Sequence, residues 1–182
     1  MAKPHGALSQ SVSESSERNP LMFARFQSAI GLFDRIDRRI TAAMAKHGLL
    51  LLRISVGIVF AWFGFLKFFP GLSPAQDLAC RTISVLSFGQ IAPEISNKIL
   101  AAWETLIGIG LLSGLYMRAT LFLLFLQMLG AATPLFLFPS EVFTIVPLAP
   151  TLEGQYIVKN LVLVSAGIVL GAAVRGGRLV PD

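Results

Sequence analysis

The residues that could do chemistry are a few charged and amide side chains inside otherwise apolar runs. Lys67 stands among phenylalanines in "FGFLKFFPG", Glu104 follows a tryptophan in "AAWETLIG", and a lysine and an asparagine are adjacent in "YIVKNLVL". A carboxylate and an ammonium group in a low-dielectric bundle stabilise each other by ion pairing. We therefore expect Glu104 to pair with Lys67 or Lys159. Asn160 is expected beside the pair, in a polar cluster that either binds a ligand or locks the bundle.

Another interpretation of the two lysines stays open. Lys67 and Lys159 lie near the ends of their apolar runs, so their stems could be buried while the ammonium groups reach the lipid headgroups. Glu104 reaches the headgroups less easily, and it is the only acidic residue inside the four apolar runs. A role in binding or in locking the bundle is therefore favoured for Glu104.

Three further polar positions are secondary candidates. Arg53 lies about one turn from the inner end of its run and is expected to anchor the helix at the interface. Arg118 lies in a tight connection between two runs, and Gln127 is expected to form a hydrogen bond between helices. No cysteine or histidine spacing indicates a metal site.

The composition indicates a membrane protein that positions these residues on spanning helices. Of 182 residues, 54% are hydrophobic and only 14% are charged, and the mean hydropathy is +0.72. Soluble domains carry about a quarter charged residues. Four runs reach the roughly 20 apolar residues that a bilayer requires, and they cover residues 48–69, 98–117, 118–138 and 155–174. The expected fold is an all-α integral membrane four-helix bundle.

The remaining segments are expected to lie outside this bundle of residues 47–175. Residues 1–20 are predicted to be a disordered cytoplasmic tail, residues 21–46 an amphipathic helix in the membrane interface, and residues 176–182 a second cytoplasmic tail. A short outer-loop helix is expected from an N-cap at Ser73, with Pro74 as its first residue, to about Leu86. The apolar loop of residues 139–154 is expected to fold back over the mouth of the bundle.

Small residues predict which helix faces pack together. Gly57, Ala61 and Gly64 recur at helical spacing on the face that also carries Lys67. On the second span, Ala101, Glu104, Gly108 and Leu111 form a matching stripe. Because small residues mark close helix contacts in membranes, we expect these two stripes to meet.

Basic residues predict the orientation. They precede the first span, follow the second and follow the fourth, whereas acidic residues predominate in the other two loops. The positive-inside rule then places both termini in the cytoplasm and the polar cluster in the outer half of the membrane. The net charge of +5 comes from basic residues at these positions, which act as topology signals, so it does not indicate binding to nucleic acid.

Three segments together resemble the DoxX family of four-span bacterial membrane proteins, including a related branch associated with resistance to reactive chlorine. They are "LLRISVGIVFAWFGFLKFFPG", "AAWETLIGIGLLSGLYMRAT" and "EGQYIVKNLVLVSAGIVLGA", and the resemblance covers about residues 48–174. It implies a place in the bacterial cytoplasmic (inner) membrane. The family's recurrent polar positions correspond here to Arg53, Lys67, Glu104, Arg118, Lys159 and Asn160.

The resemblance implies a redox or oxidative-stress context, because family members are linked to thiosulfate oxidation with quinone as acceptor. A quinone or small anion could dock at the cluster, where two lysines against one glutamate give a positive charge. No other cofactor is expected, and a redox protein or larger complex is the expected partner beside the lipid bilayer. Cys80 is the only cysteine, which argues against thiol–disulfide chemistry by this chain alone. The alternative is a non-catalytic scaffold or accessory subunit, and independent enzymatic activity is disfavoured. The oligomeric state is not predicted.

Overall fold

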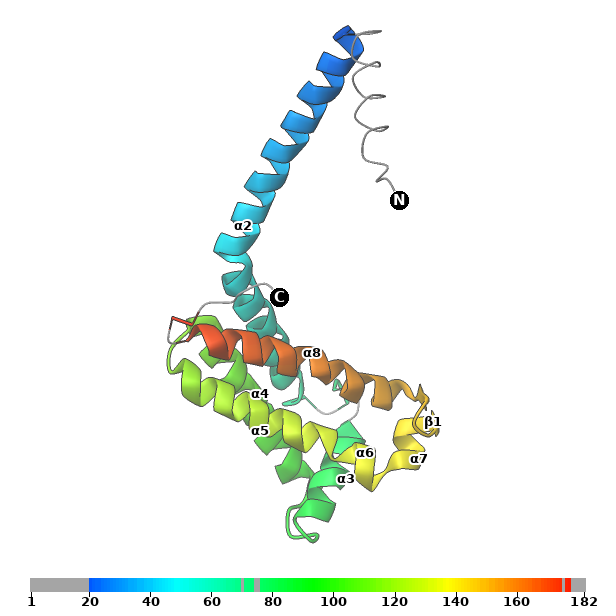
Figure 1. Cartoon of the computed structure of the whole chain (residues 1–182). Helices are drawn as coiled ribbons and strands as arrows, with labels where there is room; N and C mark the ends of the chain where they lie inside the picture. Colours follow the sequence, from blue (N-terminus) through cyan, green and yellow to red (C-terminus); the bar gives the residue numbers. More distant parts are fainter. Residues whose placement is uncertain (1–19, 70, 74–75, 175, 178–182) are drawn as a thin grey trace, which may run out of the picture. The chain divides into compact units, whose positions relative to one another are not determined.

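The computed structural model describes residues 20–69, 71–73, 76–174 and 176–177 (Figure 1). The expected disordered tail, apart from Pro20, lies outside the described residues, as do Pro74 at the expected helix start and most of the C-terminal tail. The chain divides into two compact units, Met1–Gly48 and Leu49–Asp182. Each unit is described by itself below.

In the first unit, the described residues form the beginning of helix α2, which runs from Pro20 to Leu66. Apolar residues at helical spacing, including Phe33, Ile40 and Met44, are exposed on this segment. The sequence suggested one helix that ends near residue 46 and another that begins near residue 48, whereas α2 continues through Gly48 without a break. A single glycine costs a helix only about 1 kcal/mol relative to alanine, so it does not end one. The interfacial location of residues 21–46 stays a prediction.

The second unit is an all-α membrane bundle, as predicted. Besides the end of α2, it contains α4 (Pro93–Ser113), α5 (Met117–Ala132) and α8 (Leu152–Ala173). A short helix, α6 (Pro134–Leu137), extends α5. Among the described residues, four helical segments are long and apolar enough to cross a membrane: Phe33–Leu66, Pro93–Ser113, Met117–Leu137 and Leu152–Ala173. The protein therefore belongs in a lipid bilayer.

The connection between the second and third spans differs from the prediction. The sequence suggested spans that meet at residues 117 and 118, whereas α4 ends at Ser113 and α5 begins at Met117. Gly114 has φ 72°, a left-handed conformation that glycine adopts readily, and it caps the end of α4. At its other end α4 begins earlier than expected, because Pro93 is favourable in a first turn.

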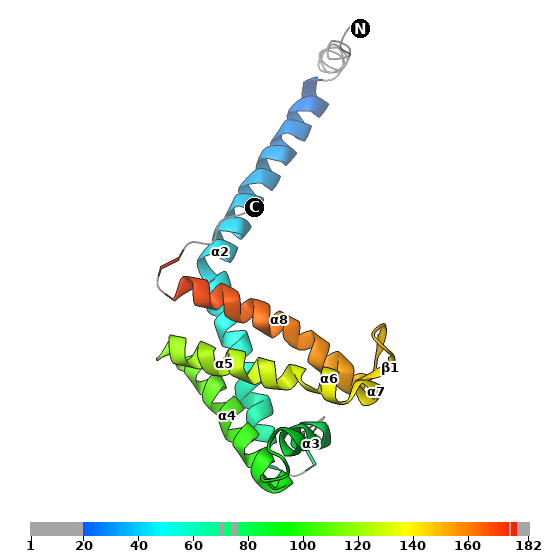
Figure 2. The same ribbon diagram turned by 60° about the horizontal axis from the view of Figure 1, so that its bottom comes forward.

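The predicted stripes of small residues meet where α2 packs against α4. A Cβ atom added at Gly64 would lie 2.6 Å from the backbone nitrogen of Thr105, and one added at Gly108 would collide with the backbone of Ala61. The two helix backbones are therefore in close contact. Helix α5 contacts both α4 and α8 (Figures 1 and 2). The core is formed by buried residues of these four helices, and it contains Val56, Phe60, Ile107, Leu111, Leu121, Leu124, Met128, Ala166 and Leu170.

Shorter elements join the helices at the end where Lys67 lies. Helix α3 (Gln76–Leu86) connects α2 to α4 and ends where the sequence predicted. After α6 come α7 (Pro139–Val142) and two short antiparallel strands, β1 (Phe143–Ile145) and β2 (Ala149–Pro150), which lead into α8.

Candidate ligand-binding site

The expected ion pair joins the end of α2 to α4. Lys67 Nζ lies 2.7 Å from Glu104 Oε2, and each side chain is only 13% exposed. Lys67 follows the last residue of α2, and Gly64 packs against the backbone of Glu104 and Thr105. The close helix contact at Gly64 therefore brings the ammonium group within reach of the carboxylate.

Gln127 of α5 binds the second oxygen of this carboxylate. Its Nε2 donates a hydrogen bond of 3.0 Å to Glu104 Oε1. Both oxygens of Glu104 are thus engaged, one by a cation and one by an amide. The sequence predicted an interhelical hydrogen bond for Gln127 but did not assign its partner.

Asn97 fixes the backbone of Lys67 and was not recognised in the sequence. Its Nδ2 donates a 2.6 Å hydrogen bond to the Lys67 carbonyl oxygen, and the residue is 8% exposed. The carbonyls at the end of α2 lack partners within the helix, so this bond satisfies one of them. The sequence did contain a signal for this residue, namely an amide side chain one turn inside the start of an apolar helix.

The two polar residues predicted on α8 lie farther from the carboxylate. Glu104 pairs with Lys67 and not with Lys159, whose ammonium group lies 5.9 Å from the centroid of the Tyr156 ring. Lys159 is exposed and Asn160 is half-buried.

These residues line a single cavity of about 620 Å³. Its lining includes all four predicted cluster residues, Lys67, Glu104, Lys159 and Asn160, together with Gln127. Most other lining residues are apolar, and most of these come from α2, α3, α5 and α8. The cavity is therefore largely hydrophobic with a polar strip, a composition typical of small-molecule sites.

Helix α3 forms one wall of the cavity. Leu78, Ile83 and Leu86 line the cavity, whereas Glu153 is its only lining residue from the loop of residues 139–154. Ile145 and Leu148 of that loop are exposed instead. That this loop folds over the mouth of the bundle stays a prediction.

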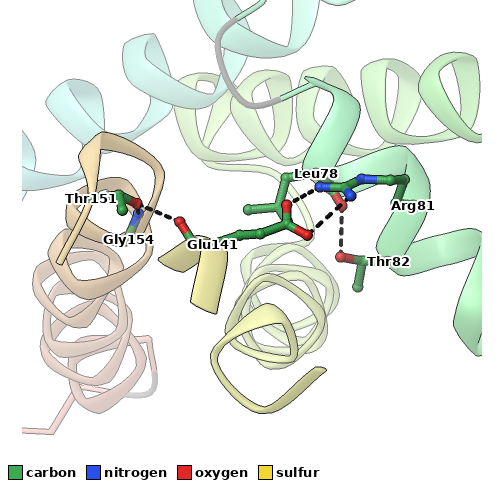
Figure 3. Close-up of polar contacts among 6 residues, drawn as sticks. All are labelled: Leu78, Arg81, Thr82, Glu141, Thr151 and Gly154. Atoms are coloured by element: carbon green, nitrogen blue, oxygen red, sulfur yellow. Dashed lines mark hydrogen bonds and ion pairs between the residues drawn. The ribbon is translucent and has the colours of Figure 1, made fainter. Parts of the chain in front are cut away.

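Arg81 of α3 binds Glu141 of α7 through two hydrogen bonds (Figure 3). The guanidinium also lies 5.2 Å from the centroid of the Phe138 ring. The hydrogen bond to Glu141 raises the pKa of Arg81. Thr151 donates to the Glu141 carbonyl oxygen at 2.7 Å and accepts from the Gly154 N–H, which caps α8 (Figure 3). These contacts connect α3, α7 and the start of α8.

Cys80 lies in α3 as predicted, with a free and buried thiol. Its Sγ donates to the Pro93 carbonyl oxygen at 3.5 Å. Burial raises the pKa of the thiol, and the neighbouring charges of Asp77 and Glu94 raise it further. The thiol form is therefore favoured over the reactive thiolate.

The other two predicted polar positions do not line this cavity. The Arg53 guanidinium packs against Gly114 at the C-terminal end of α4, where a helix dipole favours a cation. Arg118 is exposed in the first turn of α5. Both therefore lie at the end of α4 and α5 opposite the polar cluster.

Comparison with known proteins identifies the family. The DoxX family model matches residues 48–139, just over half of the chain. This range contains Lys67, Glu104 and Gln127, and it ends before α8. No curated protein and no solved structure matches the chain. The extent of the family match shows that the chain belongs to the DoxX family of membrane proteins.

Proposed function

We propose that this chain is a membrane subunit of a redox or oxidative-stress system and holds a quinone in the cavity beside Glu104. The observation that carries the proposal is the cavity itself, with apolar walls and convergent polar groups. Its volume of about 620 Å³ falls within the range of about 300–1,000 Å³ that is usual for small-molecule sites. A quinone combines an apolar ring and tail with carbonyl oxygens that accept hydrogen bonds, which suits such a lining.

The charge of the lining favours a neutral ligand over a small anion. Lys67 and Lys159 are balanced by Glu104 and Glu153. The sequence did not reveal that Glu153 belongs to the lining. The least exposed of these charges are also paired with each other. A neutral headgroup can accept hydrogen bonds from the remaining N–H groups of Lys67 and from the Asn160 amide without adding a charge.

An accessory role follows from the chemistry of the side chains. Protein side chains of this kind bind and orient a quinone, while the electron transfer belongs to the cofactor and its redox partner. The chain would therefore act with a partner protein and not as an enzyme alone. A location in the cytoplasmic membrane with cytoplasmic termini completes the proposal. Labelling of a Ser140→Cys variant from the outside of intact cells tests this topology, and labelling only from the cytoplasmic side would contradict it.

A scaffold without a ligand is the second candidate function. It is favoured by the saturation of Glu104, because both carboxylate oxygens already have partners in the protein. In that case the ion pair and the amide hold α2, α4 and α5 together and the cavity is occupied by lipid.

Filling the cavity separates the two functions. Gly130 lines the cavity, and a Cβ atom added there meets nothing within 4 Å, so Gly130→Leu should occupy the space without disturbing the packing. Gly48→Leu is the matched control, because Gly48 also has open space around it and does not line the cavity. Binding of a benzoquinone with a ten-carbon tail can be measured by calorimetry in lipid nanodiscs.

The quinone proposal predicts that Gly130→Leu weakens binding about tenfold or more, equivalent to roughly 1.4 kcal/mol, while Gly48→Leu leaves it unchanged. Unchanged affinity in both variants would place the ligand elsewhere. A wild-type protein that binds no quinone would favour the scaffold.

A further inference from the structure

We propose that Gln127 determines the specificity of the cavity by presenting its amide oxygen to the ligand, which selects headgroups that carry a hydroxyl donor. The inference rests on the proposed function and refines it: the preferred ligand is the reduced hydroquinone and not the quinone. It follows from the hydrogen-bond requirements of Glu104, Lys67 and Gln127, taken one at a time.

The orientation of the Gln127 amide is fixed by its neighbour. Lys67 Nζ lies 2.7 Å from Glu104 Oε2, and the carboxylate of such an ion pair can only accept hydrogen bonds. The Gln127 atom 3.0 Å from Glu104 Oε1 must therefore be the NH₂ group. An amide rotated by 180° would set two acceptor oxygens against each other. The Gln127 carbonyl oxygen is consequently the group left for other contacts.

That oxygen has no hydrogen bond from the protein among the described residues. Gln127 is half-buried and lines the cavity, whose walls are mostly apolar. The oxygen keeps accessible surface and is therefore open to water or to a ligand in the cavity. A ligand that displaces water there and donates a hydrogen bond satisfies the oxygen, whereas a ligand that only accepts leaves it unpaired.

Lys67 supplies the complementary group. Its ammonium carries three N–H donors, and one is used by Glu104. Lys67 and Gln127 bind the two oxygens of the same carboxylate, so a donor and an acceptor flank Glu104. A hydroxyl group can accept from Lys67 and donate to Gln127. A carbonyl oxygen or an ether oxygen can use only Lys67.

The consequence for redox chemistry has a definite sign. Tighter binding of the hydroquinone than of the quinone raises the reduction potential of the bound couple. A tenfold preference corresponds to about 30 mV for two electrons. The site would then favour reactions in which a donor passes two electrons and two protons to the quinone, forming the hydroquinone.

The test uses two probes that are not themselves redox-active. A 4-alkylphenol both donates and accepts a hydrogen bond, and its methyl ether, the 4-alkylanisole, only accepts. Both are titrated into the purified full-length protein in nanodiscs, with affinities corrected for partition into the lipid. The ratio of the two affinities within one variant is the readout, because a general loss of folded protein weakens both probes equally.

The wild-type protein should bind the phenol about tenfold more tightly than the ether, since a site built to bond a hydroxyl discriminates against the analogue that lacks it. Gln127→Met keeps a side chain of similar length and should reduce the ratio to about one. Asn160→Leu removes the other amide of the cavity lining, a donor that phenol and ether can both use, so it should weaken both probes and keep the wild-type ratio.

Equal affinities for phenol and ether in the wild-type protein would overturn the inference and leave the proposed cavity site standing. A wild-type ratio retained in Gln127→Met, or lost in Asn160→Leu, would also overturn it, because the acceptor would then be another group. Failure of both probes and of the quinone to bind would overturn the proposed function together with this inference.

Discussion

Two ion pairs at the same end of the bundle have similar chemistry and very different surroundings. Lys67 and Glu104 join α2 to α4, and each side chain is 13% exposed. Arg81 and Glu141 join α3 to α7, and their side chains are 53% and 42% exposed. Both pairs connect segments that are distant in sequence. They differ chiefly in how much solvent reaches the charges.

This difference decides what each pair can do. A buried pair contributes little net stability relative to an apolar pair, but removal of one partner leaves an uncompensated charge. An exposed pair is screened by water and salt, and its loss costs little. The Lys67–Glu104 pair is therefore suited to fix the structure around the cavity. The Arg81–Glu141 pair instead influences the position of α3, which forms a wall of the cavity.

The largest effect is expected from breaking the buried pair. Glu104→Gln leaves Lys67 without its counter-charge and should destabilise the protein by about 3–5 kcal/mol. The double variant Glu104→Leu, Lys67→Met should be close to neutral. Titration with sodium dodecyl sulfate in mixed micelles measures both free energies of unfolding. A double variant less stable than Glu104→Gln would contradict the prediction.

The helix contact that positions this pair should be nearly as sensitive. Gly64→Ala places a Cβ atom 2.6 Å from the backbone nitrogen of Thr105, so α2 and α4 must separate. Overpacking of this kind costs about 1–3 kcal/mol. Gly130→Ala is the control, because it has open space around it. Equal stability of the two variants in the same titration would show that the close contact does not constrain the helices.

The sequence predicted the close contact because glycine and alanine recur at helical spacing on both helices. It also predicted that Glu104 pairs with Lys67 or Lys159, since few charges lie inside the spans and these three lie at one depth. It did not identify Gln127 as the second partner of Glu104. That contact depends on the rotation of α5 about its axis, and periodicity within one helix does not determine it.

The contacts of the connecting segments could not be predicted. Arg81 and Glu141 are 60 residues apart in two separate connecting segments, and no pattern within either segment relates them. The same applies to the role of α3 as a cavity wall and to Glu153 in the cavity lining. The choice between Lys67 and Lys159 as the partner of Glu104 was also left open by the sequence, and in the structure Lys159 lies exposed beside Tyr156.

The exposed pair should respond weakly to mutation and strongly to salt. Arg81→Ala should lower the free energy of unfolding much less than Glu104→Gln does. The difference between Arg81→Ala and wild type should shrink in 1 M salt, where the screening length falls to about 3 Å. Thermal unfolding in detergent at low and high salt measures this. A large effect of Arg81→Ala on the free energy of unfolding that does not change with salt would contradict the prediction, because it would mean that water and salt do not screen this pair.

The smallest effect concerns Cys80, next to Arg81 in α3. Because the pKa of its thiol is raised, a smaller fraction is thiolate at neutral pH than in an unperturbed cysteine. Labelling by a small maleimide should therefore be slow and should accelerate only at higher pH. Asp77→Asn removes one of the causes and should shift the pH profile of the labelling rate downward. An upward shift, or none, would contradict the assigned cause.

The most direct test of the contrast between the two pairs is a pair of double-mutant cycles on the free energy of unfolding. One cycle combines Lys67→Met with Glu104→Leu, and the other combines Arg81→Met with Glu141→Leu. Burial should give the Lys67–Glu104 cycle the larger coupling energy, above about 1 kcal/mol, because each single variant leaves a charge without its partner. A coupling energy at Lys67–Glu104 no larger than that at Arg81–Glu141 would contradict the account.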